Sequence, residues 1–385
     1  MFKKYGPRFL AAGVFLFIFL SFIKPGRAAA PDIQAESYVL MDFRTGQVLM
    51  AKNPHERRPQ ASTTKITTAI LALERGNLND QVIASKNAAE TPESSIYLQE
   101  GETLTLEELL YALLLRSAND AAVAIAEHIG GSVENFARMM NAKVQEIGAR
   151  DTHYVNPHGL TAPDHYSSAY DLALIGRYAM MNPKFREIVA TRQRIIPWAG
   201  KPWPRLLINE NRLLWGYYAY PGADGVKNGY TTPAGQVLVA SATRDNWRLI
   251  AVVMKSPNMY RETSAILDYG FNNFHQVKLM PAGQQVALAG VRGGIAANIP
   301  AVTADDVLVV EPKNETWTWQ QRVELNPDLN APVKKGDRIG RIIFTSHDQE
   351  VSVDLIAAGD VAPRPWWMGF LEAFLTVFNL PWLRF

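Results

Sequence analysis

Apolar positions recur at helical spacing through much of the first half of the chain. From Ile66 to Leu73 they return every three or four residues, and Gly76 suits the end of a helix that begins near Ser62. The stretch Thr105-Leu106-Glu107-Glu108 is a capping-box pattern that opens another helix. Similar periodicity predicts further helices at residues 120–129, 133–147 and 168–181. Most of the segment 62–181 is therefore predicted to be helical.

Strand patterns flank this helical block on both sides. Residues 36–50 read as two short strands around the turn Phe43-Arg44-Thr45-Gly46. Two β-branched runs, 236–243 and 247–254, are joined by a short polar link and predict a hairpin, and residues 264–274 predict a closing helix. Strands on either side of a helical block indicate an α/β (α+β) domain, residues 31–275, in which helices pack on an antiparallel sheet.

The pattern changes again after about residue 275. Short alternating runs such as 284–289, 307–310 and 338–344 are separated by glycines and prolines. This spacing is typical of small all-β units. We therefore expect a separate C-terminal β-sandwich domain at residues 276–362.

Both ends of the chain carry apolar segments of about 15 residues. Residues 1–30 have a basic start, an apolar run and three closing alanines, which predicts a secretory signal peptide; the alternative is a membrane anchor, for which the run is short. Residues 363–385 contain an amphipathic helix pattern with paired tryptophans. A helix of that length rises about 22 Å, too short to span a bilayer, so we predict that it lies in the membrane interface. The alternative is a helix docked on the protein's own core.

The formal net charge of +2 comes from the N-terminal segment. The first 30 residues hold five basic residues and no acidic one, so the remainder has 34 basic and 37 acidic residues, a net charge of −3. A chain of this charge has no overall attraction to nucleic acid. There are no cysteines, which excludes disulfide and thiol chemistry.

Three short motifs follow one another along the chain. Ser62 and Lys65 are three residues apart, so a helix places them on one face, where a lysine with a lowered pKa can take the serine proton. Ser117 and Asn119 lie between two predicted helices, where simple helix capping is the alternative interpretation.

The third motif is Lys227-Asn228-Gly229. Lys227 offers a positive charge, both to a substrate carboxylate and to a neighbouring lysine whose pKa it would lower. The alternative is a polar hairpin turn, because Asn-Gly is a favoured turn dipeptide, and we expect the motif at a turn or strand start. A metal site built on His158 and His165 is disfavoured, since no metal-binding spacing accompanies them, and His158 is assigned to a structural loop.

With these motifs in place, the chain resembles the low-molecular-mass penicillin-binding proteins that are D-alanyl-D-alanine carboxypeptidases. The likeness covers essentially all of the chain after the leader. Besides the three motifs it rests on these segments: Tyr38-Val39-Leu40-Met41-Asp42, Asn156-Pro157-His158-Gly159-Leu160, Asn211-Arg212-Leu213-Leu214 and Asp224-Gly225-Val226-Lys227. The resemblance implies a β-lactamase/transpeptidase-like catalytic domain.

The resemblance also implies the role of each site residue. Ser62 would be the acylated nucleophile, Lys65 its base, and Ser117 with Asn119 the second catalytic element. Lys227, Asn228 and Gly229 would bind the substrate, and the backbone N–H groups of Ser62 and Tyr230 would form the oxyanion hole. The implied partners are a peptidoglycan stem peptide, β-lactam antibiotics as covalent inhibitors, and the membrane surface, with no cofactor or metal. The implied location is the outer face of the cytoplasmic membrane.

One position departs from the family pattern. Asn228 stands where the family usually has a threonine that binds the substrate carboxylate. Three alternatives to carboxypeptidase action stay open: endopeptidase action on cross-links, a slow enzyme that serves as a peptidoglycan-binding protein, and, more weakly, a β-lactamase.

Overall fold

The computed structural model describes residues 30–347 and 349–368. The predicted signal peptide lies outside these residues except for Ala30, and so does the predicted anchor from residue 369 onward. Within the described part of the chain, no helix is both long enough and apolar enough to cross a bilayer.

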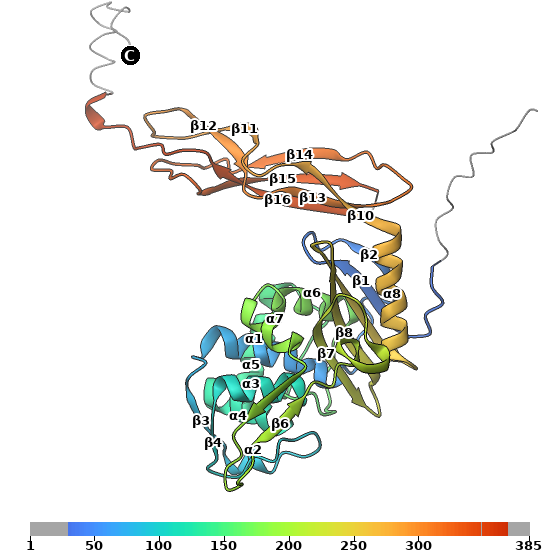
Figure 1. Ribbon diagram of the computed structural model, residues 1–385. Coiled ribbons are helices and arrows are strands. Elements are labelled where there is room, and N and C mark those ends of the chain that lie inside the picture. The colour runs from blue at the N-terminus through green and yellow to red at the C-terminus, as the bar shows by residue number, and fades with distance from the viewer. Residues whose placement is uncertain (1–29, 348, 369–385) are drawn as a thin grey trace, which may run out of the picture.

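A five-stranded antiparallel sheet is the centre of the larger part of the molecule (Figure 1). Its strands, in spatial order, are β2 (Val48–Lys52), β1 (Ser37–Asp42), β9 (Trp247–Ser256), β8 (Gly235–Arg244) and β7 (Ala223–Thr231). Both predicted pairs of strands are present, and the pairing of β1 with β9 joins them although they are about 200 residues apart.

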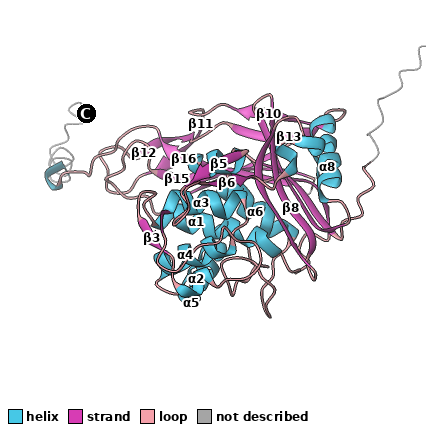
Figure 2. Cartoon of the chain, turned by 60° about the horizontal axis from the view of Figure 1, so that its bottom comes forward, coloured by secondary structure: helices cyan, strands magenta, loops and turns pink. Residues whose placement is uncertain are grey.

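Helices cover both faces of this sheet. Side chains alternate along each strand: Ile250 and Val252 of β9 pack toward the helical cluster, whereas Leu249, Ala251 and Val253 pack toward α8 on the other face. Figure 2 shows α6 and α8 on opposite sides of β8. The sheet is therefore buried on both faces, which explains why β8 and β9 have nearly continuous apolar sequences.

Most of the helical cluster follows the sequence pattern, although the helices at residues 86–89 and 183–190 were not predicted. Its helices are α1 (Lys65–Arg75), α2 (Lys86–Ala89), α3 (Leu106–Leu115), α4 (Asn119–Gly130), α5 (Val133–Ile147), α6 (Ala169–Ala179) and α7 (Pro183–Ala190). The predicted capping box is formed: Thr105 Oγ1 accepts a hydrogen bond from Glu108 N, and Glu108 Oε2 accepts one from Thr105 N. Three 3₁₀ turns also belong to this part, at Ala61–Thr64, Arg212–Leu214 and Gly216–Tyr218. Two short antiparallel strand pairs complete it: β3 (Gln81–Ile83) with β4 (Thr103–Thr105), and β5 (Gln193–Ile196) with β6 (Arg205–Ile208).

Two expectations about this part were wrong. The closing helix α8 spans Met259–Asn273, so it begins five residues before the expected start at residue 264. It begins there because the Asn258 side chain caps it by accepting a hydrogen bond from Arg261 N. The Lys227 motif lies in the middle of β7 rather than at a turn, since Lys227 pairs with Val239 across the ladder.

The C-terminal part is β-rich, as predicted. A five-stranded sheet contains, in spatial order, β11 (Gln285–Gly290), β12 (Asn298–Thr303), β16 (Gln349–Ala357), β15 (Arg338–Ser346) and β14 (Gln320–Leu325). A second, two-stranded sheet pairs β10 (Phe274–Met280) with β13 (Val307–Pro312), and a shared apolar core includes Val307, Ile342 and Leu355.

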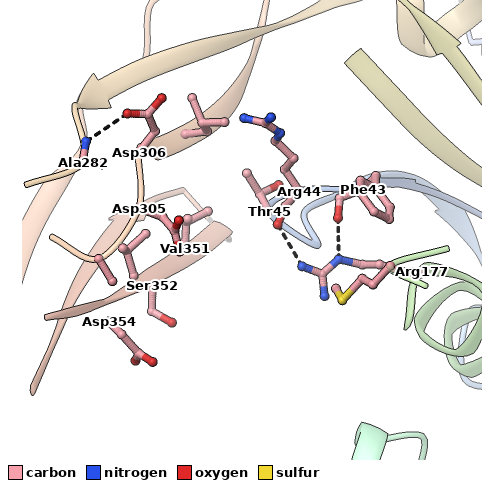
Figure 3. Close-up of a pocket in the computed structure, with 14 residues that line it drawn as sticks. Phe43, Arg44, Thr45, Arg177, Ala282, Asp305, Asp306, Val351, Ser352 and Asp354 are labelled. Carbon is pink, nitrogen blue, oxygen red and sulfur yellow. Dashed lines mark hydrogen bonds between the residues drawn. The ribbon is translucent and has the colours of Figure 1, made fainter. Parts of the chain in front are cut away.

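A buried glutamine links the two parts. Gln47, in the turn between β1 and β2, accepts a hydrogen bond from Val310 N at 2.7 Å and donates one to Val310 O at 3.3 Å. Beside it lies a cleft of about 1000 Å³, with Arg44 and Arg177 on one wall and Asp305, Asp306 and Asp354 on the other (Figure 3). The two walls therefore carry opposite charges.

Candidate active site

Ser62 lies on the 3₁₀ turn that leads directly into α1. The turn comprises Ala61–Thr64, and Lys65 is the first residue of the helix. Ser62 stays partly exposed, whereas Lys65 is fully buried. The three-residue spacing therefore places a reachable hydroxyl beside a buried amine, with Lys65 Nζ 2.9 Å from Ser62 Oγ.

Three oxygen atoms surround the Lys65 amine. Besides Ser62 Oγ, they are Asn119 Oδ1 at 2.7 Å and the His158 carbonyl oxygen at 2.6 Å. The last two are carbonyl oxygens, which only accept hydrogen bonds. A neutral amine has two N–H donors and one lone pair, so donation to these two oxygens directs the lone pair at Ser62 Oγ. The arrangement is thus suited to a lysine that accepts the serine proton.

The neutral form of Lys65 is favoured by its surroundings. Burial, and next the charge of Lys227, hold the pKa of Lys65 well below its ordinary value, although Glu210, Asp120 and Glu93 oppose this effect. Lys227 is buried as well, and burial lowers its pKa to about 8. At neutral pH, Lys227 therefore retains most of its charge, which further favours a neutral Lys65.

The second motif occupies the tight link between α3 and α4. Asn119 opens α4, its Oδ1 accepts from Lys65, and its Nδ2 donates to Pro92 O at 2.8 Å. Ser117 is 3% exposed and has a positive φ of 58°. Within the described residues its hydroxyl has no hydrogen-bond partner, which leaves it available to a substrate.

The third motif brings β7 against the serine. Strand β7 is an edge of the sheet, and a Cβ atom added at Gly229 would lie 2.8 Å from Ser62 N and 3.1 Å from Ala61 Cβ. The glycine is therefore needed for contact between β7 and the 3₁₀ turn. Lys227 Nζ donates to Asn228 O at 2.8 Å, and Asn228 Oδ1 lies 3.4 Å away. Tyr230 is 65% exposed.

One backbone element of the site was missed by sequence reasoning. The His158 carbonyl binds Lys65, and a Cβ atom added at Gly159, whose φ is +94°, would lie 2.0 Å from Ala61 O. The His158 ring is buried, which lowers its pKa to about 3, so the ring is neutral. No group of three or more metal-ligating side chains occurs among the described residues. The segment 156–160 thus contributes its main chain, and its Pro-His-Gly sequence was the available signal.

Comparison with known proteins decides the family. Residues 24–258 match the family model for D-alanyl-D-alanine carboxypeptidase, peptidase family S11, and residues 274–363 match the model for the C-terminal domain of penicillin-binding protein 5. The chain belongs to the S11 family of D-alanyl-D-alanine carboxypeptidases.

Relatives cover most of this S11 chain. It is 34% identical over 350 residues to D-alanyl-D-alanine carboxypeptidase DacF of Bacillus subtilis, and the match covers 88% of each chain. It is 35% identical over 347 residues to D-alanyl-D-alanine carboxypeptidase DacA of Haemophilus influenzae, and that match covers 86% of each chain. Among solved structures, penicillin-binding protein 5 from Haemophilus influenzae has a TM-score of 0.70 at 33% identity, covering 87% of this chain and 99% of that one. The resemblance and the fold class inferred from sequence are therefore confirmed.

An ion pair beside the lysines was also missed. Arg116 Nη1 lies 3.3 Å from Glu210 Oε1, and Glu210 N donates to Leu115 O. The Glu210 carboxylate raises the pKa of both Lys65 and Lys227, against the effect of burial. Glu210 lies outside the three motifs of this S11 protein, and no spacing rule identified it.

Proposed function

We propose that this chain is a serine D-Ala-D-Ala carboxypeptidase that removes the terminal D-alanine from peptidoglycan stem peptides. The observation that carries the proposal is the buried Lys65 amine, which two carbonyl oxygens orient toward Ser62 Oγ. Membership of the S11 family supports the same reaction.

Acylation begins with proton transfer from Ser62 to Lys65. Ser62 Oγ bonds to the penultimate carbonyl carbon, and the backbone N–H groups of Ser62 and Tyr230 stabilise the oxyanion that forms. The C–N bond then breaks, and the leaving D-alanine takes a proton relayed from Lys65 through Ser117. Lys227, Asn228 and Gly229 form the part of the cleft that receives the leaving carboxylate, with the Lys227 ammonium as its counter-charge.

Deacylation uses the same groups in reverse. A water molecule gives a proton to Lys65 and attacks the acyl carbon, and Ser62 recovers its proton as the ester breaks. Asn119 holds the Lys65 amine in place throughout. β-Lactams would acylate Ser62 in the same way and so act as covalent inhibitors.

Release of D-alanine from a tripeptide ending in D-Ala-D-Ala tests the proposal. The protein is expected to release D-alanine, and Ser62→Ala is expected to abolish the release. Absence of release by the unaltered protein would contradict carboxypeptidase activity. Labelling by penicillin alone is no substitute, because a slow enzyme can still be acylated.

A slow peptidoglycan-binding protein is the second candidate, and Asn228 is the observation that favours it. Its planar amide lies 3.4 Å from Lys227 Nζ, where a threonine would offer a hydroxyl. Loss of one hydrogen bond to a charged group costs roughly 1.5–3 kcal/mol, or about one to two decades in rate. Asn228→Thr distinguishes the two candidates: if only this variant releases D-alanine, the binding-protein function is correct.

Localisation at the cell envelope follows from the proposed substrate. The N-terminal segment 1–30 acts as an export signal, and residues 363–385 bind the outer face of the cytoplasmic membrane as an amphipathic helix. The aromatic face of that segment supports this assignment.

A further inference from the structure

A second cleft lies at the end of β7 that follows Gly229. Its volume is about 480 Å³, and it is lined by Glu93, Leu160, Thr161 and residues 230–233. Glu93 is the one charged side chain among these described lining residues. The cleft therefore has a single acidic group in a mostly neutral lining.

The position of Glu93 is fixed by the catalytic residue Asn119. Asn119 Nδ2 donates to the carbonyl of Pro92 at 2.8 Å, and Asn119 N donates to the carbonyl of Ser94 at 2.7 Å. Both neighbours of Glu93 are thus bound to the residue that also holds Lys65 Nζ. Within the described residues the Glu93 carboxylate has no ion pair or hydrogen bond of its own.

The direction of β7 relates this cleft to the substrate. In the proposed reaction, the leaving carboxylate lies at Lys227 and the scissile carbonyl lies at Ser62, opposite Gly229. The substrate residues before the scissile bond then run along β7, past Tyr230 and toward Pro233. Strand β7 is the sheet edge, and an extended peptide can align along such an edge. The acyl side of the substrate would then lie in the cleft beside Glu93.

We propose that Glu93 selects peptides that carry a free ammonium group on the residue preceding the D-Ala-D-Ala pair. This inference rests on the function proposed above and names the substrate class of the same site. A carboxylate without a protein partner attracts a cationic substrate group, whereas an acylated, neutral side chain gains no such interaction.

Two matched peptides test this selectivity. One is N-acetyl-lysyl-D-Ala-D-Ala with a free side-chain amine, and the other is the same peptide with that amine acetylated. The full-length protein is expected to favour the free amine in kcat/KM by roughly threefold to tenfold, the size expected for one partly exposed ion pair. The preference should decrease in high salt.

Variants assign the preference to a residue. Glu93→Gln is expected to bring the ratio of the two kcat/KM values close to one, whereas Glu100→Gln, an exposed glutamate of the same loop outside the cleft, should keep the original ratio. Glu93 also raises the pKa of Lys65, so its replacement can change the rate with either peptide. That change is the same for both peptides in any one variant, so it cancels in the ratio of their kcat/KM values. Equal turnover of both peptides by the unaltered protein, or an unchanged ratio in Glu93→Gln, overturns this inference alone. Release of D-alanine from neither peptide overturns the proposed function and this inference with it.

Discussion

Lys65 and Lys227 have the same chemistry, but the proposed reaction needs them in opposite protonation states. In that reaction Lys65 is neutral when it accepts the Ser62 proton, whereas Lys227 is charged when it binds a carboxylate. Burial lowers the pKa of both, but the charge of Lys227 adds to the effect at Lys65, so Lys65 loses its proton first as the pH rises. Activity therefore requires a pH above the pKa of Lys65 and below the pKa of Lys227.

The pH profile of Lys227→Arg tests this division of roles. In the unaltered protein, kcat/KM should fall as the pH rises through about 8, because Lys227 then loses its charge. A guanidinium does not titrate in this range, so the pH profile of the arginine variant should lose that alkaline limb. The kcat/KM of the variant should also be about tenfold or more lower, because a guanidinium has a different geometry from an ammonium group. The peptide with an acetylated side chain avoids titration of the substrate amine. An alkaline limb that stays near pH 8 in a folded variant would show that another group causes it.

At the scale of elements, the site depends on close main-chain contacts. Strand β7, the 3₁₀ turn of Ser62 and the segment 156–160 meet where two glycines replace side chains that would not fit. A side chain at either position would separate the serine from the groups that act on it.

Gly229→Ala tests the contact between β7 and the serine turn. The added Cβ atom would lie 2.8 Å from Ser62 N, so the strand must shift, and displacement of catalytic groups by about 1 Å can cost around a hundredfold in rate. We expect kcat/KM for D-alanine release to fall at least tenfold while the protein stays folded. Gly359→Ala is the matched control, because within the described chain nothing beyond its own chain neighbours lies within 4 Å of its added Cβ. Equal activity of the two variants would contradict the structural role given to Gly229.

Sequence patterns predicted the elements that local periodicity defines. Helix α5 spans the predicted residues 133–147, and the hairpin of β8 and β9 was recognised from its β-branched runs. The strand around Asn228-Gly229 was not, because this dipeptide locally favours a turn and only pairing with β8 makes it a strand. The His158 carbonyl and Glu210 were missed for a related reason: they reach the lysines through tertiary packing, which leaves no regular spacing in the sequence.

At the scale of the whole molecule, hydrogen bonds join the two parts of the chain at several points. Gln276 Nε2 donates to Asp42 Oδ2, and Lys313 N donates to Asn273 O. Gln47 contributes two buried hydrogen bonds to Val310, while the neighbouring cleft keeps its basic and acidic walls apart (Figure 3). The arrangement of the parts is therefore expected to depend on Gln47 more than on the exposed charges.

Gln47→Leu should loosen the two parts without affecting catalysis. The change leaves the N–H and C=O groups of Val310 without their partner, at a cost of about 1–3 kcal/mol each. Calorimetry should then show two unfolding transitions further apart than in the unaltered protein, with unchanged D-alanine release from a soluble peptide. Arg44→Ala, an exposed residue of the same turn, is the control and should have little effect. Transitions no further apart in Gln47→Leu than in the unaltered protein would show that other contacts join the parts.

The C-terminal end of the described chain lies beyond the β-rich part and far from the helical cluster (Figure 1). The backbone is fixed there up to Arg364, whose N–H donates to Gly293 O, so a chain that stops after Pro365 keeps this contact and loses only the proposed membrane helix.

The full-length protein should sediment with zwitterionic vesicles, with a modest increase for anionic ones, because apolar burial outweighs the few flanking charges. The shortened protein should stay in the supernatant and release D-alanine from a soluble tripeptide at the full rate. If it still sediments with vesicles once the N-terminal signal is removed, another surface binds the membrane. If it loses activity, the residues after Pro365 contribute to catalysis as well.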